Sequence, residues 1–184
     1  STHGLAWFPQ YVNGDFFQEL RRDWDANAVR LAMYTAESGG YCADGDQAAL
    51  RQLVIDGVDY ATAADLYVIV DWHVLSDQNP LAHADEAEAF FADMSARLAD
   101  RDNVIYEICN EPNGSATWGD VKSYANRIIP AIRANDPDAV VIVGTPEWSQ
   151  RVDQAVSDPL DADNVLYALH FYAATHQQDL RDRM

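Results

Sequence analysis

Short, almost uninterrupted apolar segments alternate with amphipathic segments along the chain, and this alternation restricts its fold more than any other feature. Continuously apolar segments are typical of parallel strands that are buried on both faces. The segments between them place apolar residues at helical spacing, and strand and helix repeat about every 30 to 40 residues, the size of a βαβ unit. The predicted strands are residues 3–7, 28–34, 66–73, 104–111, 139–143 and 164–172.

The clearest amphipathic helix follows the fourth predicted strand. Its apolar face consists of Val121, Tyr124, Ala125, Ile128, Ile129 and Ile132. Further helices are predicted within 13–24, 50–61 and 87–98, with a shorter helical segment near Ser149 and the start of another over 177–184. This order of elements fits a doubly wound sheet or a (β/α) barrel. Because no predicted strand is followed by a Gly-x-Gly-x-x-Gly turn, the sequence disfavours a dinucleotide-binding sheet.

The composition narrows the class of partner. The chain has 184 residues, enough for one domain with a core, and its formal net charge is −18 with Lys122 as its single lysine. Such a chain is not expected to bind nucleic acid or an anionic membrane, and a neutral substrate fits better. Its apolar runs are too short to span a bilayer. The two cysteines, Cys42 and Cys109, form neither a disulfide framework nor a metal motif, and Cys109 is predicted to be a buried thiol within a strand.

The strand ends favour the barrel. Most predicted strands finish in a polar or aromatic residue, namely Trp7, Tyr34, His73, Glu111 and Tyr172. In (β/α) barrels the C-terminal ends of the strands carry the chemistry. Glu111 is followed by Pro112, which cannot donate a ladder hydrogen bond, so the strand is predicted to stop at Glu111.

Side chains alternate between the two faces of a strand, so residues of equal parity share a face. If the relevant faces point into the barrel, one end of it gathers Arg30, His73, Asn110, Glu111, His170 and Tyr172. Taken singly, each has a structural explanation: a strand histidine is commonly a core residue, and Arg30 can simply pair with Glu107. Trp148 alone is as readily a core residue as a ligand platform, and Glu147 reads as a solvated loop charge. Several costly polar groups at neighbouring strand ends are hard to explain as structure alone.

The motifs at these positions, in order along the chain, are His3-Gly4-Leu5 with Trp7, then 29–34, 70–73, 106–112, 143–150 and 170–172. Together they resemble glycoside hydrolase family 5, and within it the bacterial endo-β-1,4-glucanases. The resemblance covers essentially the whole chain at matching spacing. It implies a (β/α)₈ barrel that performs retaining hydrolysis of β-1,4-glucan without a cofactor or metal, in a secreted protein.

The resemblance also implies a role for each matching residue. Glu111 would be the general acid/base, Asn110 would hydrogen-bond the sugar 2-hydroxyl, and Arg30 would orient the nucleophile. The subsite around the scissile bond would be shaped by His73, His170 and Tyr172. Substrate would be bound by His3, Trp7 and Tyr34 on the glycone side and by Trp148, an aromatic platform, on the aglycone side.

In one respect the chain departs from the family pattern. The family's nucleophile is a glutamate at the end of the seventh strand, and an eighth-strand tryptophan completes its site, but residues 1–184 match only about six of the eight βα units. We expect residues 1–184 to form a single partial catalytic domain, with the nucleophile beyond residue 184. The chain alone is then expected to be inactive, and its open sheet edges invite pairing with another copy or a complementing chain.

Three alternatives remain open from the sequence. The same barrel residues could serve mannan, xylan or mixed-linkage glucan. A non-catalytic glucan-binding protein would keep Trp7, Tyr34 and Trp148 and lack the nucleophile. A metal-dependent barrel hydrolase could use Asp71, His73 and His170 as ligands, although the usual closely spaced ligand pairs are missing.

Overall fold

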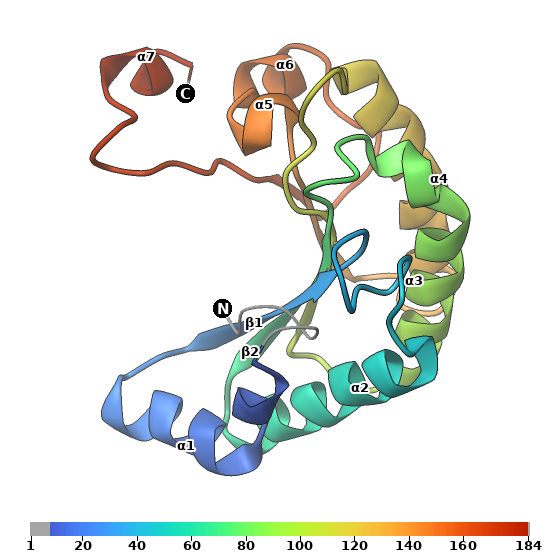
Figure 1. Ribbon diagram of the computed structural model, residues 1–184, viewed down its shortest axis with the longest axis vertical. Coiled ribbons are helices and arrows are strands. Elements are labelled where there is room, and N and C mark those ends of the chain that lie inside the picture. The colour runs from blue at the N-terminus through green and yellow to red at the C-terminus, as the bar shows by residue number, and fades with distance from the viewer. Residues whose placement is uncertain (1–7, 184) are drawn as a thin grey trace.

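The computed structural model describes residues 8–183, and within them five parallel strands form one sheet (Figure 1). The strands are β1 (Ala28–Tyr34), β2 (Tyr67–His73), β3 (Val104–Cys109), β4 (Val140–Val143) and β5 (Val165–Tyr167). They lie in the order β1-β2-β3-β4-β5, so each βα unit adds its strand on the same side of the preceding one. A doubly wound sheet would reverse direction at a switch point, and this sheet does not. The architecture is an open part of a (β/α) barrel, as predicted.

The three long helices follow one another along the outer side of the sheet (Figure 1). They are α2 (Gln47–Ala63), α3 (Ala84–Leu98) and α4 (Trp118–Arg133), and α1 (Gly14–Asp23) precedes β1. The shorter helical segments are η1 (Pro9–Tyr11), η2 (Pro80–His83), α5 (Pro146–Ser149), α6 (Val152–Ser157) and α7 (Gln178–Arg181). The helices predicted from apolar spacing are therefore confirmed in position.

Local sequence signals fix where the long helices begin. The Asp46 side chain caps α2 by accepting hydrogen bonds from the first backbone N–H groups of the helix. Thr117 and Asp120 form a reciprocal capping box at the start of α4. Each cap satisfies donors that have no partner within the helix, which stabilises the helix by about 1 kcal/mol.

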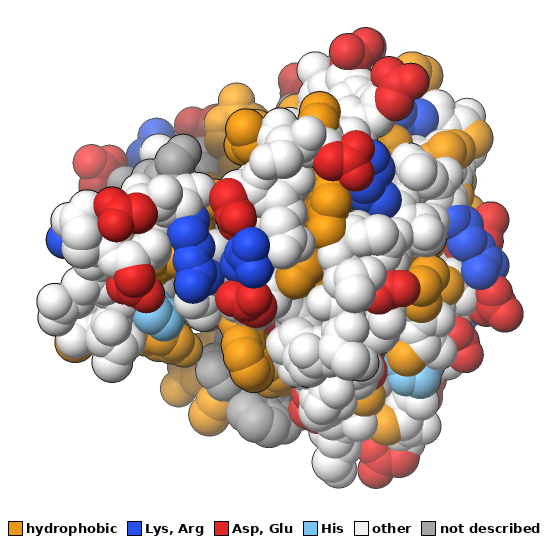
Figure 2. Space-filling model, turned by 90° about the horizontal axis from the view of Figure 1, so that it is seen from above, with side chains coloured by type: hydrophobic (Ala, Val, Ile, Leu, Met, Phe, Trp, Pro, Cys, Tyr) orange, Lys and Arg blue, Asp and Glu red, His pale blue; other side chains and the backbone are white. Residues whose placement is uncertain are grey.

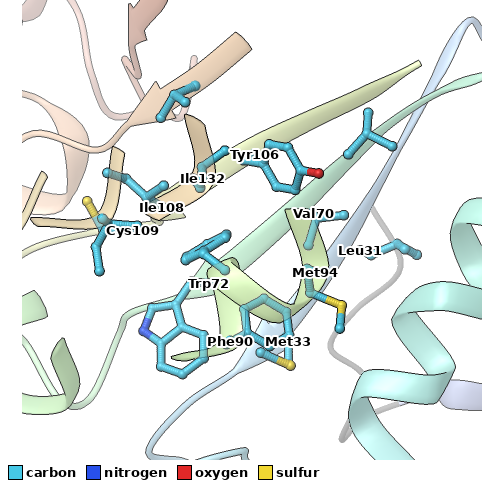
Figure 3. Packing of buried hydrophobic residues seen from close by; sticks show 14 of the residues in the cluster. Leu31, Met33, Val70, Trp72, Phe90, Met94, Tyr106, Ile108, Cys109 and Ile132 are labelled. Atoms are coloured by element: carbon cyan, nitrogen blue, oxygen red, sulfur yellow. The ribbon is translucent and has the colours of Figure 1, made fainter. Parts of the chain in front are cut away.

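The core fills the space between the outer face of the sheet and the helices (Figure 3). Trp72 of β2 and Tyr106 of β3 are fully buried there and meet the two phenylalanines of α3. The ring centroids of Trp72 and Phe90 are 5.4 Å apart, and those of Phe91 and Tyr106 are 6.2 Å apart. Burial of each such ring stabilises the fold by about 1.5–3 kcal/mol. This layer supports β2 and β3 from behind, and their opposite faces carry the polar residues.

Two predicted strands end earlier than the sequence suggested. The ladder between β3 and β4 shifts register between Glu107 and Cys109, and β3 stops at Cys109 instead of Glu111. The strand predicted over 164–172 is paired only at Val165–Tyr167, because the backbone N–H of His170 donates to the carbonyl of Ser149 and no longer to β4. After leaving the sheet, both segments hydrogen-bond to Ser149 of α5, through the carbonyl of Asn110 and the backbone N–H of His170. The strand predicted over 3–7 lies outside the described residues.

Basic side chains at the surface are largely paired with acidic ones. Figure 2 shows basic side chains lying beside acidic ones on one face of the molecule. Arg127 pairs with Asp85 at 2.6 Å and Arg151 with Glu147 at 2.9 Å, exposed contacts that contribute at most about 1 kcal/mol each. Cys109 is buried as predicted, and this burial raises the pKa of its thiol. Within residues 8–183, no helix combines the length and apolar character needed to cross a membrane.

The aromatic layer gives a direct test of the core. We expect Phe90→Ala to lower the free energy of unfolding by about 3–5 kcal/mol, because it leaves a cavity between Trp72 and Phe91. Val156→Ala is the control, since Val156 is 72% exposed and its truncation removes little packing. Urea unfolding of both variants measures the difference. Equal losses for the two would contradict the assigned core.

Candidate active site

Arg30 is the centre of a buried ion-pair network at the inner face of the sheet. Its Nε donates to Oε2 of Glu107 at 2.7 Å and its Nη2 to Oε1 of Glu107 at 2.8 Å. The same Nη2 lies 2.8 Å from Oδ2 of Asp71 and 2.9 Å from Oδ1 of Asn110. The guanidinium therefore joins β1, β2, β3 and the loop that follows β3. Bidentate pairing of this kind is the strongest geometry available to arginine and carboxylate.

The register of the sheet explains why this arginine is needed. Asp71 of β2 lies directly opposite Glu107 of β3, so two carboxylates stand side by side on one face. Burial and the adjacent Asp71 raise the pKa of Glu107, whereas Arg30 opposes this shift. Burial alone would lower the pKa of Arg30, but Asp71 and Glu107 more than offset this effect and raise it. The network is stable because one cation serves both carboxylates.

His73 is held by Asp71 and by Tyr34. Its Nδ1 lies 2.6 Å from Oδ2 of Asp71, and Tyr34, its register partner on β1, places its ring centroid 4.3 Å from the imidazole. Burial raises the pKa of the Tyr34 phenol, with a further contribution from Glu37. Tyr34 has the same parity as Arg30 on β1, and His73 the same as Asp71 on β2. Because the register pairs the two strand ends, Tyr34 and His73 both lie at the mouth, as predicted from their positions.

The loop that carries Asn110 and Glu111 is fixed on two sides. The backbone N–H groups of Asn110 and Glu111 donate to the carbonyls of Trp72 and Val74, at 3.2 and 3.1 Å. On the other side, Ser149 Oγ donates to the Asn110 carbonyl at 2.6 Å. The register shift at the end of β3 turns Asn110 toward Arg30 although its parity is opposite to that of Glu107. Asn110 therefore lies beside Arg30 at the inner face of the sheet.

Gly144 allows α5 to approach this loop. A Cβ at this position would lie 2.3 Å from the carbonyl oxygen of Cys109 and 2.6 Å from that of Asn110. No side chain other than hydrogen fits there without moving the backbone that carries Asn110.

Glu111 and His170 form the exposed part of the site. Glu111 Oε1 lies 2.8 Å from His170 Nδ1, and the two side chains are 22% and 32% exposed. The open hollow beside them is also lined by Leu169, Phe171 and Tyr172. Tyr172 is 75% exposed, so its ring is available to a ligand in this hollow. The carboxyl group can thus exchange protons with a bound molecule or with water.

Trp148 lies next to the Glu111 loop and is half-exposed, so it is not a core residue. Its backbone N–H donates to the carbonyl of Pro112 at 3.0 Å. Glu147, Trp148 and Ser149 all adopt left-handed backbone conformations, with φ of 56°, 57° and 57°. Such conformations cost about 1–3 kcal/mol each and cluster at functional sites. Glu147 is exposed, as expected, and pairs with Arg151.

The structure brings most of the predicted site residues to one end of the sheet, in two linked groups. The first group joins Arg30, Asp71, His73, Glu107 and Asn110, and the second joins Glu111, His170 and Tyr172. The predicted binding residues His3 and Trp7 lie outside the described residues. Ser149 and Gly144 belong to the 143–150 motif, but their residue types did not predict that they act on the backbone of Asn110, more than thirty residues away in the chain.

The metal-site alternative is not supported by this geometry. Asp71 and His73 contact each other and Arg30, whereas His170 contacts Glu111. Over the range 8–183, no three His, Cys, Asp or Glu side chains are arranged to hold a metal ion.

The fold and the site together define an α/β-barrel protein with a carboxylate site at the C-terminal ends of its strands. Residues 1–183 match the family described as cellulase (glycosyl hydrolase family 5), and the chain belongs to this family.

Related proteins of known type support this assignment. Endoglucanase A of Butyrivibrio fibrisolvens is 46% identical over 186 residues, with 100% of this chain and 43% of that protein covered. Endoglucanase A of Evansella cellulosilytica is 50% identical over 186 residues, with 100% of this chain and 37% of that protein covered. The chain therefore spans less than half the length of these relatives.

Two solved structures show the same fold. The cellulase Cel5C_n superimposes with a TM-score of 0.96 at 46% identity, covering 99% of this chain and 58% of that one. The catalytic domain of Thermobifida fusca endoglucanase Cel5A, a variant in complex with cellotetraose, gives a TM-score of 0.93 at 41% identity, covering 99% and 61%. These likenesses confirm the predicted (β/α) barrel architecture.

The close approach at Gly144 predicts a specific steric effect. We expect Gly144→Ala to lower the free energy of unfolding by about 1–3 kcal/mol, because its Cβ collides with two backbone carbonyls. Gly119→Ala is the matched control, since its Cβ would make only an ordinary contact of 3.6 Å with Thr117. Thermal and urea unfolding measure both changes. A Gly144→Ala variant as stable as Gly119→Ala would contradict the described packing.

Removing the central cation should produce a pH-dependent loss of stability. At pH 7 we expect Arg30→Met to cost about 3–5 kcal/mol, because it leaves Asp71 and Glu107 buried without a cation. Loss of Arg30 removes the group that lowers the pKa of Glu107, so this pKa, already raised by burial, rises further.

A carboxyl group whose pKa is raised in the folded state destabilises the fold only when ionised. The deficit of Arg30→Met should therefore be smallest below about pH 4 and grow as the pH rises through the shifted pKa. Urea unfolding of wild type and variant across this range tests the sign. The exposed Arg22→Met serves as control, and a deficit for Arg30→Met that does not change with pH would contradict the electrostatic explanation.

Proposed function

We propose that the protein of which this chain is part hydrolyses β-1,4-glucosidic bonds in cellulose or related β-glucans, acting within the polymer and retaining anomeric configuration. The observation that carries the proposal is the solvent-accessible Glu111 carboxyl group, held 2.8 Å from His170 in a cellulase-family site. The relatives' names support the same substrate, and cellotetraose is bound in one of the similar structures.

In the proposed mechanism Glu111 acts twice. It first donates a proton to the glycosidic oxygen of the leaving sugar while a second carboxylate attacks the anomeric carbon. It then accepts a proton from the water that hydrolyses the glycosyl-enzyme intermediate. His170 Nδ1 faces Oε1 of Glu111, so a hydrogen on this nitrogen orients the carboxylate during the second step.

Asn110 has hydrogen-bonding capacity left for substrate. Its Oδ1 accepts from Arg30 and one hydrogen of its Nδ2 is directed at the Val74 carbonyl, 3.1 Å away. The amide nitrogen carries a second hydrogen, which can be donated to the sugar 2-hydroxyl. Arg30 fixes the Asn110 side chain in this orientation.

The nucleophile is proposed to be a glutamate beyond residue 184. A retaining glycosidase requires two carboxyl groups about 5–5.5 Å apart. Asp71 and Glu107 are 0% and 3% exposed and are bonded to Arg30, so neither is free to attack a sugar. The task of the described site is therefore acid/base chemistry and sugar binding.

Aromatic side chains supply the proposed sugar contacts. Trp148 and Tyr172 expose their rings near the site, and the apolar face of a pyranose packs on such rings. Tyr34 packs on His73 and is buried, and we propose that it contacts sugar on the glycone side through the small part of its surface that is exposed. His3 and Trp7 are proposed to extend this surface on the glycone side. A neutral polymer requires no basic patch, in keeping with the net charge of −18. Because polymeric glucan cannot enter a cell, we propose that the protein acts after secretion.

The acid/base role predicts an effect that depends on the leaving group. In a chain extended by two further βα units, we expect Glu111→Gln to lower kcat/KM for cellotetraose by about 10²–10⁴-fold. The same change should affect the first step much less for a dinitrophenyl cellobioside, whose leaving group departs without protonation. Glu19→Gln, at an exposed position on α1, is the matched control and should keep wild-type rates. An equal loss for both substrates would overturn the acid/base assignment.

The chain over residues 1–184 alone should not turn over either substrate, because the nucleophile is absent from it. Activity of this short form would place the nucleophile within these residues and contradict the proposed partner of Glu111. Binding of cellotetraose by the extended form without any hydrolysis would favour a glucan-binding protein instead.

We also propose that the chain on its own associates with a second copy. Within the described residues, β1 and β5 are the edges of the sheet, and Leu166 and Phe171 at the β5 side are 55% and 60% exposed. Unpaired strand edges beside apolar side chains favour edge pairing. Sedimentation velocity should show a concentration-dependent dimer or larger species, and a monomer at all concentrations would contradict this proposal.

A further inference from the structure

Asp71 is a fully buried carboxylate for which the proposed mechanism has no use. Its Oδ2 lies 2.8 Å from Arg30 Nη2 and 2.6 Å from His73 Nδ1. Its Oδ1 is buried and has no hydrogen-bond partner among the described residues. Asp71 thus has no contact with solvent, and any effect it has on substrate must pass through Arg30 or His73.

Arg30 determines what Asp71 can do for His73. Oδ2 of Asp71 forms an ion pair with the Arg30 guanidinium, and a carboxylate in an ion pair has acceptors only. The same oxygen faces His73 Nδ1, and the hydrogen in that short contact therefore belongs to Nδ1. A neutral imidazole carries one hydrogen, so its second nitrogen, Nε2, is then an acceptor.

We propose that Asp71 is a positioning residue that holds His73 in the Nδ1–H tautomer, so that Nε2 accepts a hydrogen bond from a sugar hydroxyl. This inference rests on the proposed glucan-hydrolysing function. Nε2 makes no hydrogen bond to any described residue, and the side chain keeps 12% of its surface exposed. Tyr34 packs on the ring and Asp71 contacts its Nδ1, so the imidazole is held in place as well as in tautomer.

The two histidine–carboxylate pairs of the site have different tasks in this arrangement. Glu111 is accessible and changes its protonation during turnover, so the hydrogen bond from His170 changes with it. Asp71 is out of contact with solvent and paired with Arg30, and it contacts His73 only at Nδ1, so it leaves Nε2 free for substrate. An acceptor at this point selects a sugar that offers a hydroxyl hydrogen and disfavours one in which that hydroxyl is replaced by fluorine.

The tautomer can be read directly by long-range ¹H–¹⁵N NMR of the histidine rings. In the wild-type chain we expect His73 to carry hydrogen on Nδ1 and none on Nε2. Asp71→Asn should keep this pattern, because Arg30 requires the amide oxygen at the place of Oδ2. Asp71→Leu removes the acceptor and should convert a large share of His73 to the Nε2–H form. Glu107→Gln is the control, since it alters the Arg30 network without touching His73 and should leave the tautomer unchanged.

Substrate binding supplies the second readout. Titration with cellotetraose should shift the Nε2 signal of His73 and leave Nδ1 nearly unchanged. In the extended chain, kcat/KM should fall about 10–100-fold for Asp71→Leu and recover largely in Asp71→Asn. An Nε2–H signal for His73 in the wild type, or the same tautomer in wild type and Asp71→Leu, overturns the proposal.

The positioning role of Asp71 and the proposed hydrolysis of glucan can be contradicted independently of each other. An Nδ1–H signal in a protein whose extended form does not hydrolyse glucan supports the positioning role of Asp71 and overturns the proposed function. Hydrolysis by a protein whose His73 is in the Nε2–H form overturns the positioning role alone.

Discussion

The structure of the site depends on the pairing of Arg30 with two carboxylates that the sheet register places side by side. Asp71 and Glu107 lie opposite each other on β2 and β3, where their mutual repulsion and desolvation would destabilise the fold. One guanidinium compensates both and also binds Asn110. Because each partner belongs to a different segment, the ion-pair network aligns three segments of the barrel at the end where the chemistry takes place.

The outer face of the sheet carries the apolar core residues, and the inner face carries the polar residues of the site. On the outer face, Trp72 and Tyr106 pack against the helices and fix the positions of β2 and β3. On the inner face, the residues one position away in the same strands, Asp71, His73 and Glu107, face Arg30 or one another. The rigid apolar layer allows the polar layer to be held within hydrogen-bonding distance. Glu111 itself is placed by neither layer but by a loop that is hydrogen-bonded to β2 on one side and α5 on the other.

Sequence patterns located the regular elements well where local signals are strong. The strand at 28–34 was predicted with its observed bounds, because continuous apolar character and parity are local properties. The end of β5 was predicted too late because most of residues 168–172 are apolar or aromatic although they have left the ladder. The end of β3 was predicted too late because Pro112 was used as the stop signal, whereas the ladder already shifts register between Glu107 and Cys109. Beyond the ladder, the backbone groups of both segments bond to residues distant in the sequence. His170, for example, donates to the Ser149 carbonyl, and no local sequence pattern predicts this partner.

The sequence by itself determined the alternation of strands and helices, the helix caps, the acidic surface and the kinds of side chain at the strand ends, since all of these follow from residue type and spacing. From these came the barrel class and the resemblance to the cellulase family. Only the tertiary structure decided that Arg30 joins Glu107 and Asn110, residues 77 and 80 positions away, and that Asp71 faces His73 while Glu111 faces His170. The physical reason is that these contacts depend on strand register and loop path, which are set by packing between segments far apart in the chain.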